Sequence, residues 1–287
     1  MNRLAFILFL VLTLVGASCG RTDPALTRAD AVMEQAPDSA LAILESIDTA
    51  ALRSERSRAL YGLLLTQACV KCDVPVASDS LIAASARYFA DHGPDSLTMR
   101  AMFYKGWVLN WNGHHIEAMN PTLQAEALSR QANNYYWMAK SCELLADIYD
   151  CSYYYKEAAT YYKKASIYYL KAGKYENHLY SSSDVGFEFG KSGKLSEGIA
   201  IIDSVLNIAK RTNNKELISY TLSDALFLYY ENKDFRKASD TYNKILLMPN
   251  NTIKSFSDIS IKALLDIEVK EFSIADSIFK SPYSREL

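Results

Sequence analysis

A pattern that repeats every forty residues limits this chain to few folds. Four blocks carry it, beginning at Phe103, Glu143, Ser183 and Ser223. In each block a small or apolar residue is followed twelve positions later by a small residue, and seven positions after that by another apolar residue. Apolar residues also recur three and four apart over most of the chain, which is typical of amphipathic helices. The pattern predicts an all-α protein made of repeated helix pairs.

The small residues of this pattern resemble those of the tetratricopeptide repeat, a helix-turn-helix unit whose two helices cross at small side chains. The crossing pairs are Gly106 and Ala118, Ala146 and Ala158, Gly186 and Gly198, and Leu226 and Ala238. Larger side chains there would force the backbones apart, at about 1–3 kcal/mol. Gly113 and Gly193 stand where the family turns between its helices. The resemblance implies a right-handed α-solenoid of helical hairpins with a period of about 40 residues.

The pattern continues more weakly on both sides of the four blocks. Helices are expected over 25–35, 36–48, 58–71 and 78–93, the second with Pro37 and an Asp38 N-cap. Downstream, "VKEFSIADSIF" echoes "NKDFRKASDTY" at a spacing of thirty-seven residues. We therefore expect about six hairpins and a partial last one, in a single domain over 25–287.

The first eighteen residues predict a secretion signal. Arg3 precedes twelve residues, "LAFILFLVLTLV", that are too few to span a bilayer of ~30 Å. The sequence "VGASCG" that follows resembles the lipobox of bacterial lipoproteins, which implies a signal peptide over 1–18, lipidation of Cys19 and a tether over 19–24. An ordinary cleaved signal with an unmodified Cys19 is the alternative.

Three further stretches, "PDSALAILESID", "LLLTQA" and "YKGWV", resemble secreted tetratricopeptide lipoproteins of Gram-negative anaerobes. This resemblance implies a cell-envelope protein, lipid-anchored to the outer membrane and facing the periplasm. Longer members continue into a transmembrane helix and a cytoplasmic output domain. A sensor-type relative lacking its output domain therefore remains an alternative.

Composition and motifs give little support to catalysis, metal binding or nucleic-acid binding. With 31 basic against 33 acidic residues, the chain lacks the positive excess typical of nucleic-acid binders. Neighbouring His114 and His115 diverge on a helix and make poor joint metal ligands. No cofactor, metal or catalytic group is predicted, and the chain is not expected to be an enzyme.

Cys69 and Cys72 form a "CVKC" motif at the end of a predicted helix, where the helix dipole disfavours a thiolate. Two alternatives stay open for them, a strained disulfide in an oxidising compartment or two small buried residues. The recurring "Asp-Ser/Thr-small" triplets resemble an O-glycosylation sequon, although several fit helix N-caps equally well.

The tyrosine-rich stretch 152–174 is predicted to pack rather than to bind. At ~100° per residue, Ala158, Tyr162, Ala165 and Tyr169 share the arc of a second helix that faces its partner. Tyr154, Tyr161 and Tyr168 lie beside that arc, where a neighbouring repeat is expected.

The family resemblance implies that the functional surface is a concave groove lined by the first helix of each hairpin. Aromatic residues with scattered charges suit a protein or peptide partner. Trp107 and Trp111 are the best candidates for exposed anchors, whereas packing between repeats is an equal alternative for Phe103, Phe187 and Phe227. A glycan-binding lipoprotein of a polysaccharide-uptake system is a second possible function for the same aromatics. The predicted groove residues are Arg100, Phe103, Trp107, Asn110, Trp111, Lys140, Glu143, Asp147, Asp150, Tyr180, Ser183, Phe187, Lys191, Tyr220, Ser223, Phe227, Tyr230 and Glu231.

Overall fold

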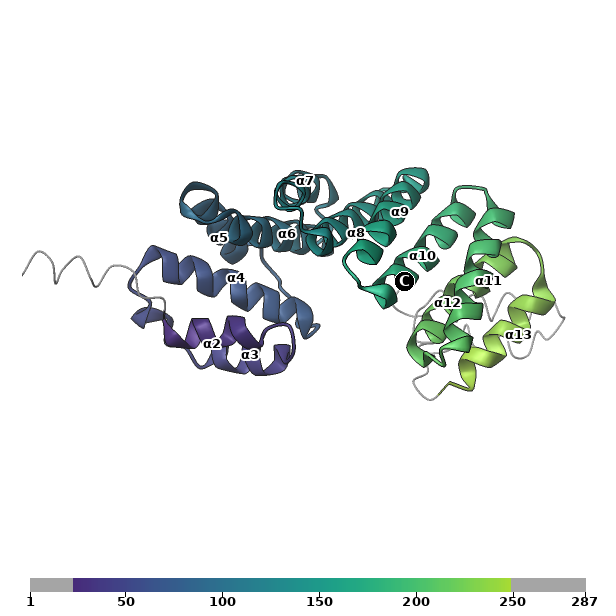
Figure 1. Cartoon of the computed structure of the whole chain (residues 1–287), viewed down its shortest axis with the longest axis horizontal. Coiled ribbons are helices and arrows are strands. Elements are labelled where there is room, and N and C mark those ends of the chain that lie inside the picture. Colours follow the sequence, from purple (N-terminus) through teal and green to yellow (C-terminus); the bar gives the residue numbers. More distant parts are fainter. Residues whose placement is uncertain (1–22, 249–287) are drawn as a thin grey trace, which may run out of the picture. The chain divides into compact units, whose positions relative to one another are not determined.

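The computed structural model describes residues 23–248, and these residues form helices joined by short turns (Figure 1). The described chain contains twelve α-helices and one 3-10 turn and no strand, which confirms the all-α prediction. Between residues 23 and 248, no helix is long and apolar enough to cross a membrane. The predicted signal peptide, the predicted lipidation site Cys19 and the helix expected near 269–279 lie outside the described residues.

The chain divides into two compact units, whose described parts are residues 23–132 and 133–248. The first unit contains three helical hairpins, and its α2 carries an N-cap at Asp23 whose side chain accepts a bond from the Ala25 N–H. Its helices are α2 (Pro24–Val32), α3 (Pro37–Glu45), α4 (Glu55–Lys71), α5 (Ser80–His92), α6 (Asp95–Trp111) and α7 (His115–Gln131), with a 3-10 turn over Thr49–Ala51.

The second unit also contains three hairpins. Its helices are α8 (Tyr135–Cys151), α9 (Tyr155–Lys171), α10 (Tyr175–Lys191), α11 (Leu195–Arg211), α12 (Lys215–Glu231) and α13 (Phe235–Leu246). Each helix packs against the next, and α10 also packs against α12, so first helices of neighbouring hairpins lie side by side. The six hairpins of the two units agree with the number predicted from the sequence.

From α6 onward a new helix begins every twenty residues, because a three-residue turn follows each helix of seventeen residues. The middle residue of each turn has a positive φ, whether the turn lies within a hairpin, as at Gly113 (81°), Tyr153 (63°) and Gly193 (90°), or between hairpins, as at Gly173 (70°). At Gly113 the turn is closed by bonds from its own N–H to the Asn110 carbonyl and from the His114 N–H to the Leu109 carbonyl. This is the Schellman pattern, which satisfies carbonyls at the end of a helix. The expected turns at Gly113 and Gly193 are therefore confirmed, and the twenty-residue spacing was hidden within the forty-residue repeat.

Small residues lie where the two helices of a hairpin cross, as predicted. A Cβ placed on Gly106 would lie 2.2 Å from the Thr122 hydroxyl oxygen. A Cβ on Gly198 would lie 2.5 Å from the carbonyl oxygen of Gly186 and 2.9 Å from the backbone nitrogen of Gly190. In the α10–α11 hairpin the two backbones therefore approach too closely for any side chain at this position.

The structure corrects one detail of the sequence prediction and adds contacts to another. Asp38 does not cap α3, because the helix begins one residue earlier with Pro37 and its N-cap is Ala36. Tyr161 and Tyr168 were expected to lie where a neighbouring repeat packs. They contact the other helix of their own hairpin, since their rings stack on Tyr149 and Tyr135 of α8, at 5.4 Å and 6.3 Å between centroids.

Tyr154 also departs from the expected packing, because it lies in the turn before α9 and is 59% exposed. The inward arc of α9 is confirmed for Ala158, Ala165 and Tyr169, which are fully or almost fully buried.

Candidate functional site

The predicted groove residues of the second unit meet one another across neighbouring first helices. Tyr180 of α10 and Tyr220 of α12 stand forty residues apart, and their rings meet edge to face with centroids 5.1 Å apart. The rings of Phe187 and Phe227, also forty apart, meet in the same manner at 5.3 Å. Because equivalent positions touch each other, α10 and α12 present one continuous face built from the repeat.

The aromatic residues of this face differ in accessibility. Phe187 and Phe227 are partly buried and pack against the core formed by α11, α12 and α13. The packing alternative therefore describes them well. Tyr220, in contrast, is 42% exposed. Tyr230, near the end of α12, lies against Phe235 with centroids 5.7 Å apart.

Six carboxylates gather on the same side of the second unit, and we call them the acidic face. Glu143, Asp147 and Asp150 belong to α8, Asp184 and Glu188 to α10, and Asp224 to α12. Their charges act on one another, since Asp184 is influenced by Asp224, Glu143 and Asp147, and Glu188 by Asp150. Three neighbouring first helices thus bring their acidic residues together.

Hydroxyl groups from adjacent helices hold these carboxylates in place. On α9, Tyr162 donates to Asp147, and Tyr169 donates to Glu143 at 2.7 Å. These tyrosines belong to the tyrosine-rich stretch, so its inward arc both packs the hairpin and orients carboxylates on α8.

The bonds on the other side of the acidic face come from neighbouring first helices. The Tyr220 hydroxyl of α12 donates to Asp184 of α10. The Ser183 hydroxyl of α10 donates to Asp224 of α12 at 2.8 Å. The two helices therefore exchange hydrogen bonds, each holding a carboxylate of the other.

Burial raises the pKa of four carboxyl groups on the acidic face, those of Asp147, Asp184, Glu188 and Asp224. The pKa of Asp147 rises to about 7 because of burial and the nearby charges of Glu143 and Asp150, against the opposing effects of the Tyr162 hydroxyl and Lys140. The pKa of Asp224 also rises to about 7 through burial. Burial and the charge of Asp224 raise the pKa of Asp184 well above its ordinary range. The face therefore holds protons at neutral pH that ordinary carboxyl groups would have released.

Lys191 is the cation at the end of the acidic face. Its amine binds Asp150 of α8 and, at 3.0 Å, Glu188 of its own helix. The same amine lies over the ring of Tyr155, 4.4 Å from its centroid, and over that of Phe187 at 5.0 Å. Because Lys191 is held on several sides, it belongs to the structure of the face rather than to a free binding position.

The predicted groove residues of the first unit behave differently from one another. Trp107 and Trp111, one turn apart on α6, stack with centroids 5.3 Å apart and planes inclined by only 8°. Trp111 is 67% exposed, as an anchor for a partner would be. Phe103 is 3% exposed and lies in the core, so the packing alternative describes it and the groove assignment does not. Asn110 is bound to the imidazole Nδ1 of His115 at 2.7 Å across the turn.

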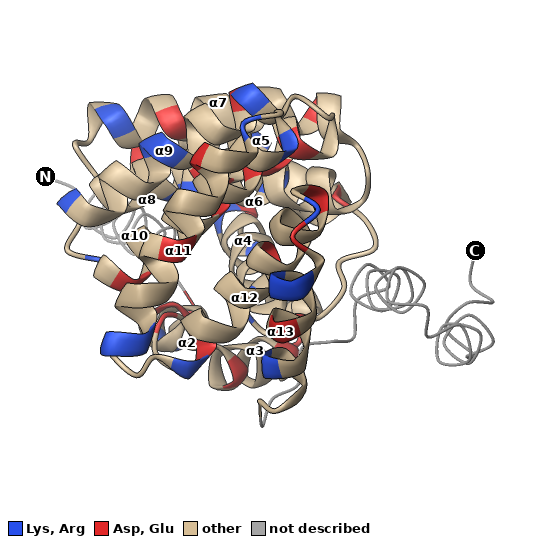
Figure 2. Ribbon diagram, turned by 90° about the vertical axis from the view of Figure 1, so that its right-hand side faces the viewer, with Lys and Arg blue, Asp and Glu red and all other residues tan. Residues whose placement is uncertain are grey.

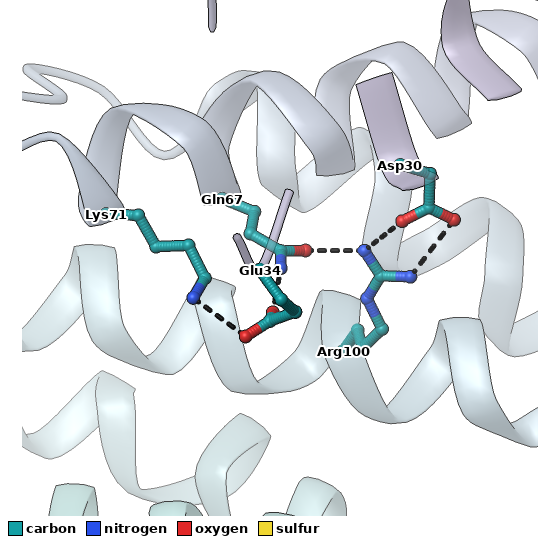
Figure 3. A network of polar contacts seen from close by, with 5 residues as sticks. All are labelled: Asp30, Glu34, Gln67, Lys71 and Arg100. Atoms are coloured by element: carbon teal, nitrogen blue, oxygen red, sulfur yellow. Dashed lines mark hydrogen bonds and ion pairs between the residues drawn. The ribbon is translucent and has the colours of Figure 1, made fainter. Parts of the chain in front are cut away.

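Arg100 is occupied by a polar network that joins three hairpins (Figure 3). Its guanidinium binds the Asp30 carboxylate of α2 at 2.8 Å and the Gln67 amide oxygen of α4 at 2.5 Å. The Gln67 amide nitrogen donates to Glu34 at 3.1 Å, and Glu34 also accepts from Lys71 at 2.9 Å. Arg100 was predicted to contact a ligand, but the structure gives it a role in holding the first helices together.

Metal ligands and reactive thiols are the remaining candidates for chemistry in the described residues. Among residues 23–248, no group of three His, Cys, Asp or Glu residues has the arrangement of a metal site. Cys69 and Cys72 are free thiols. Burial raises the pKa of both, with Asp38 adding to the effect at Cys72, so neither is activated as a thiolate. Figure 2 shows that both basic and acidic residues occur on the helices, as expected of solvated helix surfaces.

The sequence analysis found Glu143, Asp147 and Asp150 but missed Asp184, Glu188 and Asp224. The missing signal was present in the repeat, because "SD" occurs at both Ser183–Asp184 and Ser223–Asp224, forty residues apart. Family positions alone selected the serine of each pair, whereas the structure shows that the adjacent aspartate faces the neighbouring helix.

Known structures support the fold. No protein-family model matches the chain, and no curated protein matches it. The structure of NprR in complex with its cognate peptide NprX matches with a TM-score of 0.68 and 15% identity, covering 89% of this chain and 75% of that one. The apo form of RapI matches with a TM-score of 0.67 and 15% identity, covering 89% of this chain and 74% of that one. TPR-like repeats of a kinesin light chain from Podosopora anserina match with a TM-score of 0.57 and 14% identity. They cover 71% of this chain and 100% of that one. At these identities the likeness shows the fold, a TPR-like α-solenoid of helical hairpins.

Proposed function

We propose that this protein is a scaffold that binds a protein or peptide on the first helices of its second unit. The observation that carries the proposal is the continuous face of α8, α10 and α12. This face combines oriented carboxylates with the partly exposed rings of Tyr180 and Tyr220. Rigid aromatic rings and fixed polar groups are the features by which interfaces recognise a partner.

The similar structures support this proposal. NprR was solved with its cognate peptide, and a Rap protein was solved with the competence and sporulation factor. Both match this chain over most of its length, so a peptide-binding role is compatible with its helical framework. We further propose that the chain is secreted and held at a membrane through a lipid on Cys19, which rests on the sequence "VGASCG" alone. Incorporation of labelled palmitate that is lost in Cys19→Ser would test the anchor.

Site-specific photo-cross-linking tests the binding face. A photoreactive phenylalanine derivative placed at Ser223, on the face of α12, is expected to cross-link to a partner in native cells. The matched control carries the same photoreactive amino acid in place of Ser204, which is exposed on the second helix α11. Cross-links identified by mass spectrometry should concentrate at Ser223. Equal yields at both positions would contradict the proposed face.

A glycan-binding function is the second candidate, and the stacked pair of Trp107 and Trp111 favours it. Exposed aromatic faces suit the apolar faces of sugar rings as well as peptide side chains. Binding to a glycan panel that disappears in Trp111→Ala would support this function. Trp107→Ala and Trp111→Ala should each keep the melting temperature of the wild type within a few degrees. A steep fall for Trp111→Ala would show that the ring is needed for packing and not for recognition.

A further inference from the structure

We propose that the acidic face binds a cationic peptide segment, whose lysine or arginine side chains sit against Asp147, Asp184 and Asp224. This inference rests on the proposed function, because it assumes that the first helices of the second unit form the ligand surface. It adds the chemical class of the ligand, which neither the fold nor the similar structures specify.

The first argument is the imbalance of charge on the face. Its six carboxylates come from α8, α10 and α12. Lys140 acts on Asp147, and Lys191 acts on Glu188 and Asp224. Lys191 is shared between Asp150 and Glu188. The carboxylates thus outnumber the lysines by three to one, and like charges brought together in a partly buried site destabilise one another. A cation supplied by a ligand would remove this repulsion.

The second argument is a buried carboxylate oxygen that lacks a partner. Glu188 is only 2% exposed, and its Oε1 accepts from Lys191. Its Oε2 is buried without a hydrogen-bond partner among the described residues. The side chain is directed at Asp150, with which it interacts, so two carboxylates share one lysine. A buried acceptor of this kind needs a proton or a cation.

The third argument is that the face is organised before a ligand arrives. Tyr162, Tyr220 and Ser183 each donate one hydroxyl to Asp147, Asp184 and Asp224 respectively. Within the described chain, one hydroxyl donor reaches each of these carboxylates. A fixed acceptor loses little conformational freedom when it binds a cation, so an ammonium or guanidinium group gains charge-assisted hydrogen bonds at low entropic cost.

Binding of a cation to this face must release protons. The groups that face Asp184 are Glu143 and Asp147 of α8, Tyr162 of α9, and Tyr220 and Asp224 of α12. None of them is a cation, so the unliganded face retains protons near neutral pH. A lysine or arginine of the ligand favours the ionised carboxylates and displaces these protons. Affinity should therefore rise as the pH increases through neutrality and fall as it decreases.

The test uses the full chain and a labelled peptide of alternating lysine and serine, with peptides of equal length carrying glutamate or glutamine in place of lysine. We expect the lysine peptide to bind at least about 10-fold more tightly than either control, and more tightly at about pH 8 than at about pH 6. Calorimetry in two buffers of different ionisation enthalpy should show proton release on binding.

Asp184→Asn should weaken binding of the lysine peptide by about 10-fold. The asparagine side chain still accepts the hydrogen bond from the Tyr220 hydroxyl, so the variant removes only the negative charge of the ionised Asp184. Asp203→Asn is the matched control, because Asp203 also accepts a tyrosine hydroxyl, that of Tyr229, but lies on the second helix α11. Its affinity should equal that of the wild type.

The outcomes separate this inference from the proposed function. Binding of the glutamine or glutamate peptide as tightly as the lysine peptide would overturn the cationic ligand while leaving a peptide-binding scaffold intact. If Asp184→Asn and Asp203→Asn weaken binding of the lysine peptide equally, the binding site lies elsewhere. Lysine-peptide binding without proton release would show that the buried carboxylates do not take part.

Discussion

Replacement of Gly198 by alanine tests whether the backbones of α10 and α11 are as close as the structure shows. The added Cβ would lie 2.5 Å from the Gly186 carbonyl oxygen and 2.9 Å from the Gly190 nitrogen, and both are backbone atoms. A side chain at such a distance could rotate away, but the backbone of a helix cannot. The two helices must therefore move apart by about half an ångström before the methyl group fits.

The expected cost follows from two opposing effects. Overpacking of this kind destabilises by about 1–3 kcal/mol, because well-packed neighbours must shift. Alanine in a helix interior is favoured over glycine by about 1 kcal/mol. We expect the cost of overpacking to exceed the gain in helix propensity, with a net loss of about 1–2 kcal/mol in the free energy of unfolding. Gly186→Ala should lose less, since its Cβ comes no nearer than 3.0 Å to any of its neighbours.

Urea unfolding followed by far-ultraviolet circular dichroism gives the comparison. Ser204→Ala is the control, because Ser204 is exposed on the same helix α11 and the change removes only a hydroxyl group. Its stability should stay within about 0.5 kcal/mol of the wild type. If Gly198→Ala is as stable as the wild type or more stable, the close crossing of α10 and α11 is refuted. A loss in Gly186→Ala larger than in Gly198→Ala would contradict the order of distances.

Substitutions at three further positions test other parts of the structure. Tyr162→Ala should lower the free energy of unfolding by about 3 kcal/mol in the same urea assay. Tyr162→Phe leaves Asp147 without its hydroxyl donor and should cost about 1–3 kcal/mol. An alanine variant as stable as the wild type would contradict the packing of α9. Asp224 has a pKa raised to about 7 from 3.8, so its contribution to stability is complete below pH 3.8 and is lost as the pH rises through about 7. Asp224→Asn should therefore be more stable than the wild type by about 2 kcal/mol at pH 8, allowing for partial solvent exposure, and about equally stable near pH 4. Melting temperatures measured at the two pH values give the comparison. If the variant and the wild type melt at the same temperature at both pH values, the buried carboxyl group is contradicted. Lys233→Gly should raise the melting temperature through a gain of about 1 kcal/mol, because Lys233 holds a φ of 59° that favours glycine; a lower melting temperature would show that its side chain is needed.

The hairpin fold could be predicted because its signals are local and repeated. Small residues at the crossings, such as Gly106 and Gly198, follow from the closeness of two backbones and recur at a fixed spacing. The turn at Gly113 was visible because glycine marks a positive φ. The equivalent turn at Tyr153 was not visible, since a tyrosine in that conformation gives no such mark and is tolerated only because the surrounding helices fix the turn.

The site was predicted less well, because the neighbours of a side chain depend on which helices lie together. Family positions placed Arg100 in a groove, but Asp30, seventy residues earlier, takes its charge. Phe103 occupies a groove position in the repeat and is nevertheless buried. Asp184 and Asp224 were missed because their importance comes from two helices exchanging hydrogen bonds, which no single repeat reveals.

The Asp30–Arg100 pair has a consequence for how the first unit unfolds. In most solenoids each repeat touches only its immediate neighbours, so stability is a sum of local contributions and the ends can fray independently. Arg100 of the third hairpin binds Asp30 of the first as well as Gln67 of the second, and this contact skips a repeat. Loss of the terminal hairpin would leave the guanidinium without its carboxylate. The three hairpins are therefore coupled as one cooperative unit, in which the amino-terminal repeat cannot open without weakening the third.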